Sequence, residues 1–195
     1  NVRDLPVGGH QPSAMTDERG RLLGLMDLVC LAEDRFLLAL EGMTGDQFEE
    51  TYRMLLLLED IEVVRRDERV TTVQGGELAV EGLSWPSPRS RAGGTDVLGA
   101  APELDAIPEA SPGVLEALRI EAGRPRFPVD ASDKQLPHEL GLRDTHLHFE
   151  KGCYRGQEII HRVDVMGQVR KQLVGVRLDG AVEAGGALKS AEGKK

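Results

Sequence analysis

One stretch in the last third of the chain combines a thiol, two cations and a predicted helix start. Residues 151–158 read KGCYRGQE, so that Lys151 and Arg155 flank Cys153 just before the helix. Free backbone N–H groups at a helix start and the two cations all favour the thiolate form of a cysteine. Thiolates carry out nucleophilic, redox and metal-binding chemistry. Cys153 is therefore the leading candidate for a reactive group, with Lys151 beside it; the alternative is a small apolar turn residue.

Three further side chains of this stretch could contact a ligand. Tyr154 is expected to be half-buried with its hydroxyl free, and Gln157 could donate to a ligand or satisfy the turn. Glu158 lies four residues before Arg162, a spacing typical of an exposed ion pair on a helix. Glu158 could instead cap the start of that helix.

A second candidate lies at the end of an earlier predicted helix, where Glu121 follows Arg119. A carboxylate can accept two parallel N–H bonds from a planar amidine-like edge, and the 2-aminopyrimidinone edge of a pterin has this geometry. The alternative is an exposed or ion-paired helical glutamate. The sequence therefore allows a pterin contact at Glu121 without requiring one.

Metal and nucleotide sites have little support in the sequence. His146, His148, Cys153 and His161 are close in sequence, but no paired-cysteine motif or zinc-binding helix motif accompanies them. Two cysteines are too few for an iron–sulfur cluster held by this chain, so any cluster would bridge to a partner. The glycine pairs lack the spacing of phosphate-binding loops. We expect no resident metal and no bound nucleotide.

Composition narrows the class of protein. The chain has 195 residues, 40% of them hydrophobic and 29% charged, with a net charge of −9. This charge argues against a broad nucleic-acid-binding surface. No apolar run reaches the length of about 20 residues that spans a bilayer. Two dissimilar cysteines and the absence of a leader predict a reducing compartment, and we expect a cytoplasmic protein without membrane or direct nucleic-acid contacts.

Periodicity and turn residues predict a mixture of strands and helices. Expected strands cover residues 13–16, 22–32, 36–40, 61–64, 69–73, 96–100 and 169–178, and expected helices cover 44–58, 112–122 and 157–163. The pair 22–32 and 36–40 should form a hairpin that turns at residues 33–34. Residues 85–95, rich in Pro, Ser, Arg and Gly, should be a loop.

The segments 118–125 (LRIEAGRP), 136–142 (LPHELGL) and 151–158 together resemble the YgfZ-type folate-binding family. That family belongs to the superfamily of the glycine-cleavage aminomethyltransferase, or T-protein, and the resemblance runs from about residue 119 to 178. It implies an α+β fold with two interleaved, ferredoxin-like α/β domains and a truncated C-terminal β-barrel. The first, folate-binding domain would comprise residues 1–18 and 74–164, the inserted domain 19–73, and the start of the barrel 165–195.

The resemblance also implies a cofactor and a function. Tetrahydrofolate would lie near Glu121, with Arg119, Tyr154, Gln157 and Glu158 as further cofactor-binding residues, and Cys153 and Lys151 would be catalytic. The family assists iron–sulfur protein assembly or repair and thereby tRNA modification, with iron–sulfur enzymes as partners. The alternative is a true aminomethyltransferase, which uses an aspartate near the folate and generally lacks the KGCY block. A third reading is an inert scaffold that holds a partner.

Overall fold

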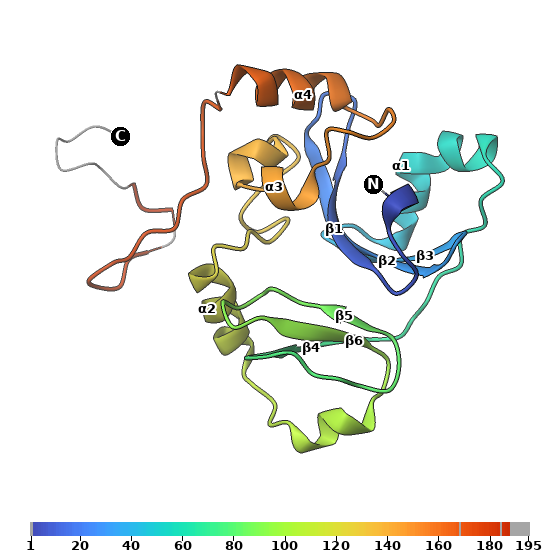
Figure 1. Cartoon of the computed structure of the whole chain (residues 1–195). Helices are drawn as coiled ribbons and strands as arrows, with labels where there is room; N and C mark the ends of the chain where they lie inside the picture. The colour runs from blue at the N-terminus through green and yellow to red at the C-terminus, as the bar shows by residue number, and fades with distance from the viewer. Residues whose placement is uncertain (1, 168, 184, 188–195) are drawn as a thin grey trace.

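The computed structural model describes residues 2–167, 169–183 and 185–187 and has an α+β fold built on two sheets. Each sheet has three antiparallel strands, in the orders β1-β2-β3 and β4-β6-β5. Figure 1 shows the two sheets at separate levels, with α2 beside the second sheet, α3 beside β1 of the first, and α4 at the top of the view. The α+β class is confirmed. The described residues contain no closed barrel.

The first sheet consists of two consecutive hairpins. Its strands are β1 (His10–Thr16), β2 (Leu22–Ala32) and β3 (Arg35–Glu41). The predicted hairpin between β2 and β3 is confirmed, since the two strands pair from Leu25 opposite Glu41 to Ala32 opposite Arg35. Leu22 and Leu25 of β2 belong to the apolar cluster, which comprises Leu22, Leu25, Phe127, Ala131, Leu140 and Leu142. Burial of this cluster fixes the C-terminal half of the chain against the first sheet.

Helix α1 (Gly45–Leu58) follows the first sheet and begins where the sequence predicts. The Thr44 side chain accepts the Gln47 N–H, and the Gln47 side chain accepts the Thr44 N–H, which forms a complete capping box. No residue of α1 is buried. The strand predicted at residues 61–64 is wrong, because this exposed segment has no regular structure and pairs with no strand.

The second sheet joins β4 (Val70–Gln74), β5 (Ser84–Pro86) and the central β6 (Gly94–Leu98). The loop predicted at residues 85–95 is therefore partly wrong, since its first two residues belong to β5 and its last two belong to β6. Trp85 is opposite Asp96 in this pairing, and both residues are buried. The proline of β5 is tolerated because β5 is an edge strand, where a missing N–H costs little.

After β6, the regular elements in the described part of the chain are helices, joined by long irregular segments. This part of the chain contains α2 (Pro112–Glu121), α3 (Arg143–His146) and α4 (Gln157–Met166), with short 3₁₀ helices at Pro102–Ala106 and Pro137–Leu140. A further 3₁₀ helix, Val2–Asp4, precedes β1. The strand predicted at 169–178 is wrong, because these residues are irregular and mostly exposed and pair with no strand. Part of the predicted barrel start, residues 168, 184 and 188–195, lies outside the described residues.

Two of the predicted domain boundaries lie in the sheets, one in a turn between paired strands and one inside a strand. The boundary after residue 18 lies in the turn between β1 and β2, which are paired along their lengths. The boundary after residue 73 lies within β4, which pairs with β6. The division into interleaved domains stays a prediction. Within the part of the chain that is described, no helix combines the length and apolar character needed to cross a membrane.

Candidate functional site

A pocket of about 320 Å³ lies between the two sheets and the segment that follows α2. Strands β2 and β3 form one wall, the β4–β6–β5 sheet another, and residues 119–126 a third. The charged and titratable side chains that line it are Asp27, Glu41, Arg89, Asp96, Arg119, Arg124, Arg126 and His146. The pocket thus presents both carboxylates and guanidinium groups to a ligand.

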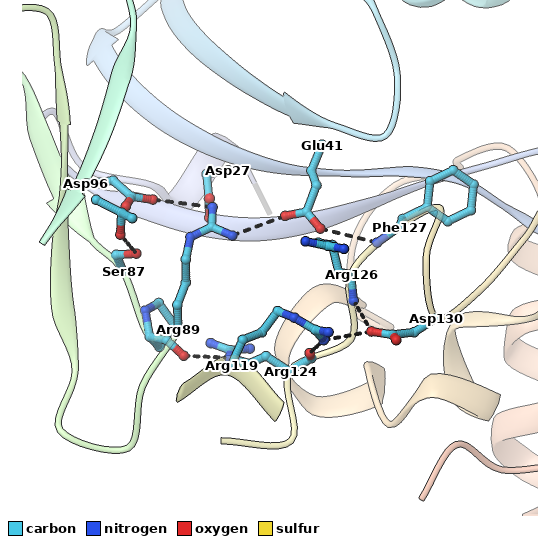
Figure 2. Close-up of polar contacts among 12 residues, drawn as sticks. Asp27, Glu41, Ser87, Arg89, Asp96, Arg119, Arg124, Arg126, Phe127 and Asp130 are labelled. Carbon is cyan, nitrogen blue, oxygen red and sulfur yellow. Dashed lines mark hydrogen bonds and ion pairs between the residues drawn. The ribbon is translucent and has the colours of Figure 1, made fainter. Parts of the chain in front are cut away.

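Arg89 connects the two sheets across this pocket. It lies just after β5, and its guanidinium is 3.3 Å from Glu41 of β3 and 3.6 Å from Asp96 of β6. Figure 2 shows Arg89 reaching toward these two carboxylates. Burial lowers the pKa of Arg89, but Asp96, Glu41 and Asp27 outweigh burial and raise it above its ordinary value. Arg89 is therefore a permanent cation that holds the walls together.

Glu41 uses both of its oxygens within the protein. One oxygen pairs with Arg89, and the other accepts the Phe127 N–H at 3.2 Å. Phe127 belongs to the apolar cluster. Glu41 thereby links β3 to the segment after α2 and has little capacity left for a ligand.

Arg119, predicted to bind the cofactor, lies in the pocket wall but has its guanidinium occupied. It donates to Glu116, to Asp130 at 2.6 Å and to the Arg124 carbonyl. Its hydrogen bonds to Glu116 raise its pKa. Asp130 also accepts the Arg126 N–H at 2.8 Å (Figure 2). This network fixes the turn that follows α2, so in this structure Arg119 shapes the wall of the pocket.

Asp27 is the most accessible carboxylate of the pocket wall that has capacity for a ligand. Its Oδ1 lies 2.7 Å from Nε2 of His10, and its side chain is 23% exposed. Asp27, Glu41 and Arg89 were not among the site residues predicted from the sequence. One signal was present: Asp27 is the single charged residue within the otherwise apolar stretch 22–32.

His146 lines the same pocket. Its Nδ1 lies 2.7 Å from the Thr145 hydroxyl. Burial and then the nearby Arg124 lower the pKa of His146 to about 4, so the ring is neutral at pH 7. His146 and Cys153 do not gather into a metal site, and no group of three or more metal-ligating side chains was found among the described residues.

The Cys153 loop lies outside this pocket. None of residues 151–158 is among the lining residues. Cys153 is exposed, and Lys151 places its Nζ 4.7 Å from the centre of the Tyr154 ring. Burial lowers the pKa of Lys151 and raises that of Tyr154. The Tyr154 hydroxyl is buried and has no hydrogen-bond partner in the described structure.

Close backbone contact fixes this loop to the turn between β1 and β2. At Gly156, where φ is +81°, an added Cβ would lie 2.4 Å from the Asp17 carbonyl and 2.7 Å from Cα of Gly20. The Thr16 hydroxyl donates to the Arg155 carbonyl at 2.7 Å. Position 156 therefore requires glycine, because no side chain fits where the two backbones cross.

The guanidinium of Arg155, predicted to favour the Cys153 thiolate, contacts other residues in the structure. It pairs with Glu18 at 2.6 Å and donates to the Thr51 carbonyl at 3.2 Å. Gln157 accepts the Tyr154 N–H through its side chain at 3.3 Å, so it satisfies the turn. The predicted Glu158–Arg162 ion pair is confirmed, with a separation of 2.6 Å between exposed side chains.

Glu121 is the last residue of α2 and is exposed. Its carbonyl accepts a hydrogen bond from Nε of Arg91 at 2.9 Å, and its side chain is not part of the pocket lining. Of the catalytic and cofactor-binding residues predicted from the sequence, Arg119 alone lines the pocket. The structure does not bring Glu121 and Cys153 together around this pocket.

Comparison with known proteins finds a partial sequence similarity to one plant protein. No family model matches the chain. A protein of Arabidopsis thaliana named "Putative transferase At1g60990, chloroplastic" is 35% identical over 80 residues. The match covers 41% of this chain and 18% of that protein, so the chain aligns with less than a fifth of its relative. This partial similarity is compatible with a transferase-type protein.

Proposed function

We propose that this chain binds tetrahydrofolate in the pocket between its two sheets, as part of a transferase-like protein. The observation that carries the proposal is the mixed charge of the pocket wall. A folate has a pterin edge that donates paired N–H groups and a glutamate tail that carries carboxylates, so it needs acceptors at one end and cations at the other. The volume of about 320 Å³ is within the usual range of ligand pockets, roughly 300–1,000 Å³.

Asp27 is the acceptor that we assign to the pterin edge. Glu41 is bonded through both oxygens, and Asp96 is only 1% exposed. Asp27 is partly exposed and has one oxygen on His10, which leaves its second oxygen for the ligand. A carboxylate in this position accepts charge-assisted hydrogen bonds, which are stronger than bonds between neutral groups.

The biological role that we propose follows the family resemblance: support of iron–sulfur protein assembly or repair and tRNA modification. In this proposal Cys153 acts at the surface, because its side chain is exposed and lies outside the folate pocket. A partner iron–sulfur enzyme would have direct access to it. The compartment would be a reducing one, as in the cytoplasm, since both Cys30 and Cys153 are free thiols.

One observation favours the alternative, an aminomethyltransferase: an aspartate, Asp27, lines the pocket. Transfer of a folate-linked methylene in the presence of a lipoylated carrier would support this enzyme. Folate affinity that survives Cys153→Ala, together with lost activity of iron–sulfur enzymes in cells, would support the assembly role.

Titration with tetrahydrofolate tests the binding proposal directly. Trp85, the single tryptophan of the chain, lines the pocket, so its fluorescence should be quenched saturably. We expect Asp27→Asn to weaken binding about tenfold or more, the effect of losing a hydrogen bond to a charged group. Asp34→Asn, in the exposed β2–β3 turn, is the matched control and should bind normally. A titration without saturable quenching would contradict the proposal.

Glu121→Gln decides between the two candidate carboxylates. Weakened binding in this variant would place Glu121 at the ligand, as the resemblance implies. Unchanged affinity, together with a loss in Asp27→Asn, would assign the pterin edge to Asp27.

A further inference from the structure

We infer that Arg124 forms an anion-binding subsite in the pocket and takes a carboxylate or phosphate group of the ligand. The inference deepens the proposed function and rests on the pocket receiving a ligand. Asp27 is assigned to the pterin edge of the ligand, and Arg124 would bind the anionic group at the ligand's other end.

Arg124 differs from the other arginines of the pocket in its pairing. Each of the others has a carboxylate partner: Arg89 has Glu41 and Asp96, Arg119 has Glu116 and Asp130, and Arg126 has Glu116 at 3.1 Å. Within the described ranges, no carboxylate forms an ion pair with Arg124. Figure 2 shows Arg124 in the same group of side chains as its paired neighbours.

The hydrogen bonding of Arg124 leaves its outer nitrogens available. Its Nε donates to the Pro88 carbonyl at 2.9 Å, which holds the guanidinium plane against the wall. The two terminal nitrogens have no hydrogen-bond partner in the described part of the chain. A guanidinium held in this way presents the two-pronged geometry that binds carboxylate and phosphate.

The surroundings of Arg124 make an unpaired cation costly. The residue is half-buried, and burial and then Arg89 work against its charge. Asp27 and Glu41 attract it from a distance, but they pair with His10 and Arg89. Removing a charge from water without a partner costs free energy, and an anionic ligand group would supply the partner.

Fragments of the ligand test the inference separately from the whole. The probes are 6-methyltetrahydropterin, which has the donor edge and no carboxylate; p-aminobenzoylglutamate, which has two carboxylates and no pterin; and inorganic phosphate. The variants are Arg124→Gln and the matched control Arg91→Gln. Both arginines donate from Nε to a backbone carbonyl at 2.9 Å, but Arg91 is exposed and does not line the pocket.

We expect Arg124→Gln to weaken binding of p-aminobenzoylglutamate about tenfold or more and to leave binding of 6-methyltetrahydropterin unchanged. Arg91→Gln should bind both probes as the wild type does. Arg124→Lys should recover part of the lost affinity, because it restores the charge without the two-pronged geometry. Matching thermal unfolding of the variants shows that the loss arises in the pocket.

Three results would overturn the inference: equal behaviour of Arg124→Gln and Arg91→Gln, equal losses for both fragments, or no binding of p-aminobenzoylglutamate and phosphate by the wild type. A different result would separate it from the proposed function. If p-aminobenzoylglutamate or phosphate binds through Arg124 while tetrahydrofolate and the pterin do not, the anion subsite stands and the folate assignment falls.

Discussion

Acidification should destabilise this protein through His146, at the wall of the pocket. Its pKa is about 4 in the folded protein, because burial and then Arg124 oppose its charge. In the unfolded chain its pKa is near 6.5, the ordinary value. Between these two values the unfolded chain binds a proton that the folded protein does not. The contribution of His146 to stability is therefore fully present above pH 6.5 and is lost progressively as the pH falls toward 4.

The size of the effect follows from this difference in pKa. The full shift corresponds to a ceiling of about 3 kcal/mol, of which about 2 kcal/mol would be lost by pH 5. Because His146 is partly exposed, solvent screening reduces this figure, and we expect a loss of about 1 kcal/mol between pH 7.5 and pH 5. The paired carboxylates Glu116 and Asp164 have lowered pKa values, so their contributions are lost mainly at still lower pH.

Urea unfolding at several pH values measures this directly. The free energy of unfolding of the wild type should fall from pH 7.5 to pH 5, and His146→Gln should remove most of this dependence. Burial also lowers the pKa of His138, which adds a slope of the same sign, so the double variant with His138→Gln should have the flattest profile. A His146→Gln profile as steep as that of the wild type would refute the reasoning.

Three further predictions concern the cap, the core and the thiol. Thr44→Ala should lower the free energy of unfolding by about 1 kcal/mol in urea titrations, because it removes the helix cap of α1; a loss near zero would mean that α1 contributes little to global stability. Ile160→Ala should cost about 2–5 kcal/mol in the same assay, because Ile160 is fully buried, and Val165→Ala on the exposed side of α4 is its control. Cys153 should be alkylated faster than Cys30 at neutral pH, because Cys30 is 2% exposed and its thiol donates to the Ala32 carbonyl. Mass spectrometry after iodoacetamide treatment measures the labelling of each cysteine, and equal labelling would contradict this prediction.

Local signals in the sequence predicted the elements that depend on near neighbours. The β2–β3 hairpin followed from two apolar runs around a two-residue turn, and α1 followed from the Thr44 cap. Strands predicted at 61–64 and 169–178 were wrong because apolar composition cannot show whether a partner strand exists. β5 was missed for the opposite reason: two of its three residues lie in a stretch with loop composition, and its pairing with β6 creates the strand.

The candidate site divides in the same way. The Cys153 loop is contiguous, so its composition was readable, although its distance from the pocket was not. The pocket is assembled from β2, β3, the β4–β6–β5 sheet and residues 119–126. The Arg89 contact to Glu41 joins residues that are 48 positions apart in the sequence. Such a site becomes visible only after strand pairing is known. Asp27, a charge inside an apolar strand, was the available hint.

The crossing of Gly20 and Gly156 determines where the Cys153 loop can be altered. The two backbones touch there, and a methyl group at Gly156 would push the loop away from the β1–β2 turn. At Gly152, by contrast, an added Cβ would meet no atom within 4 Å. A spectroscopic label or a cross-linker attached at residue 152 would therefore detect molecules that bind near the Cys153 thiol without changing the conformation of the loop.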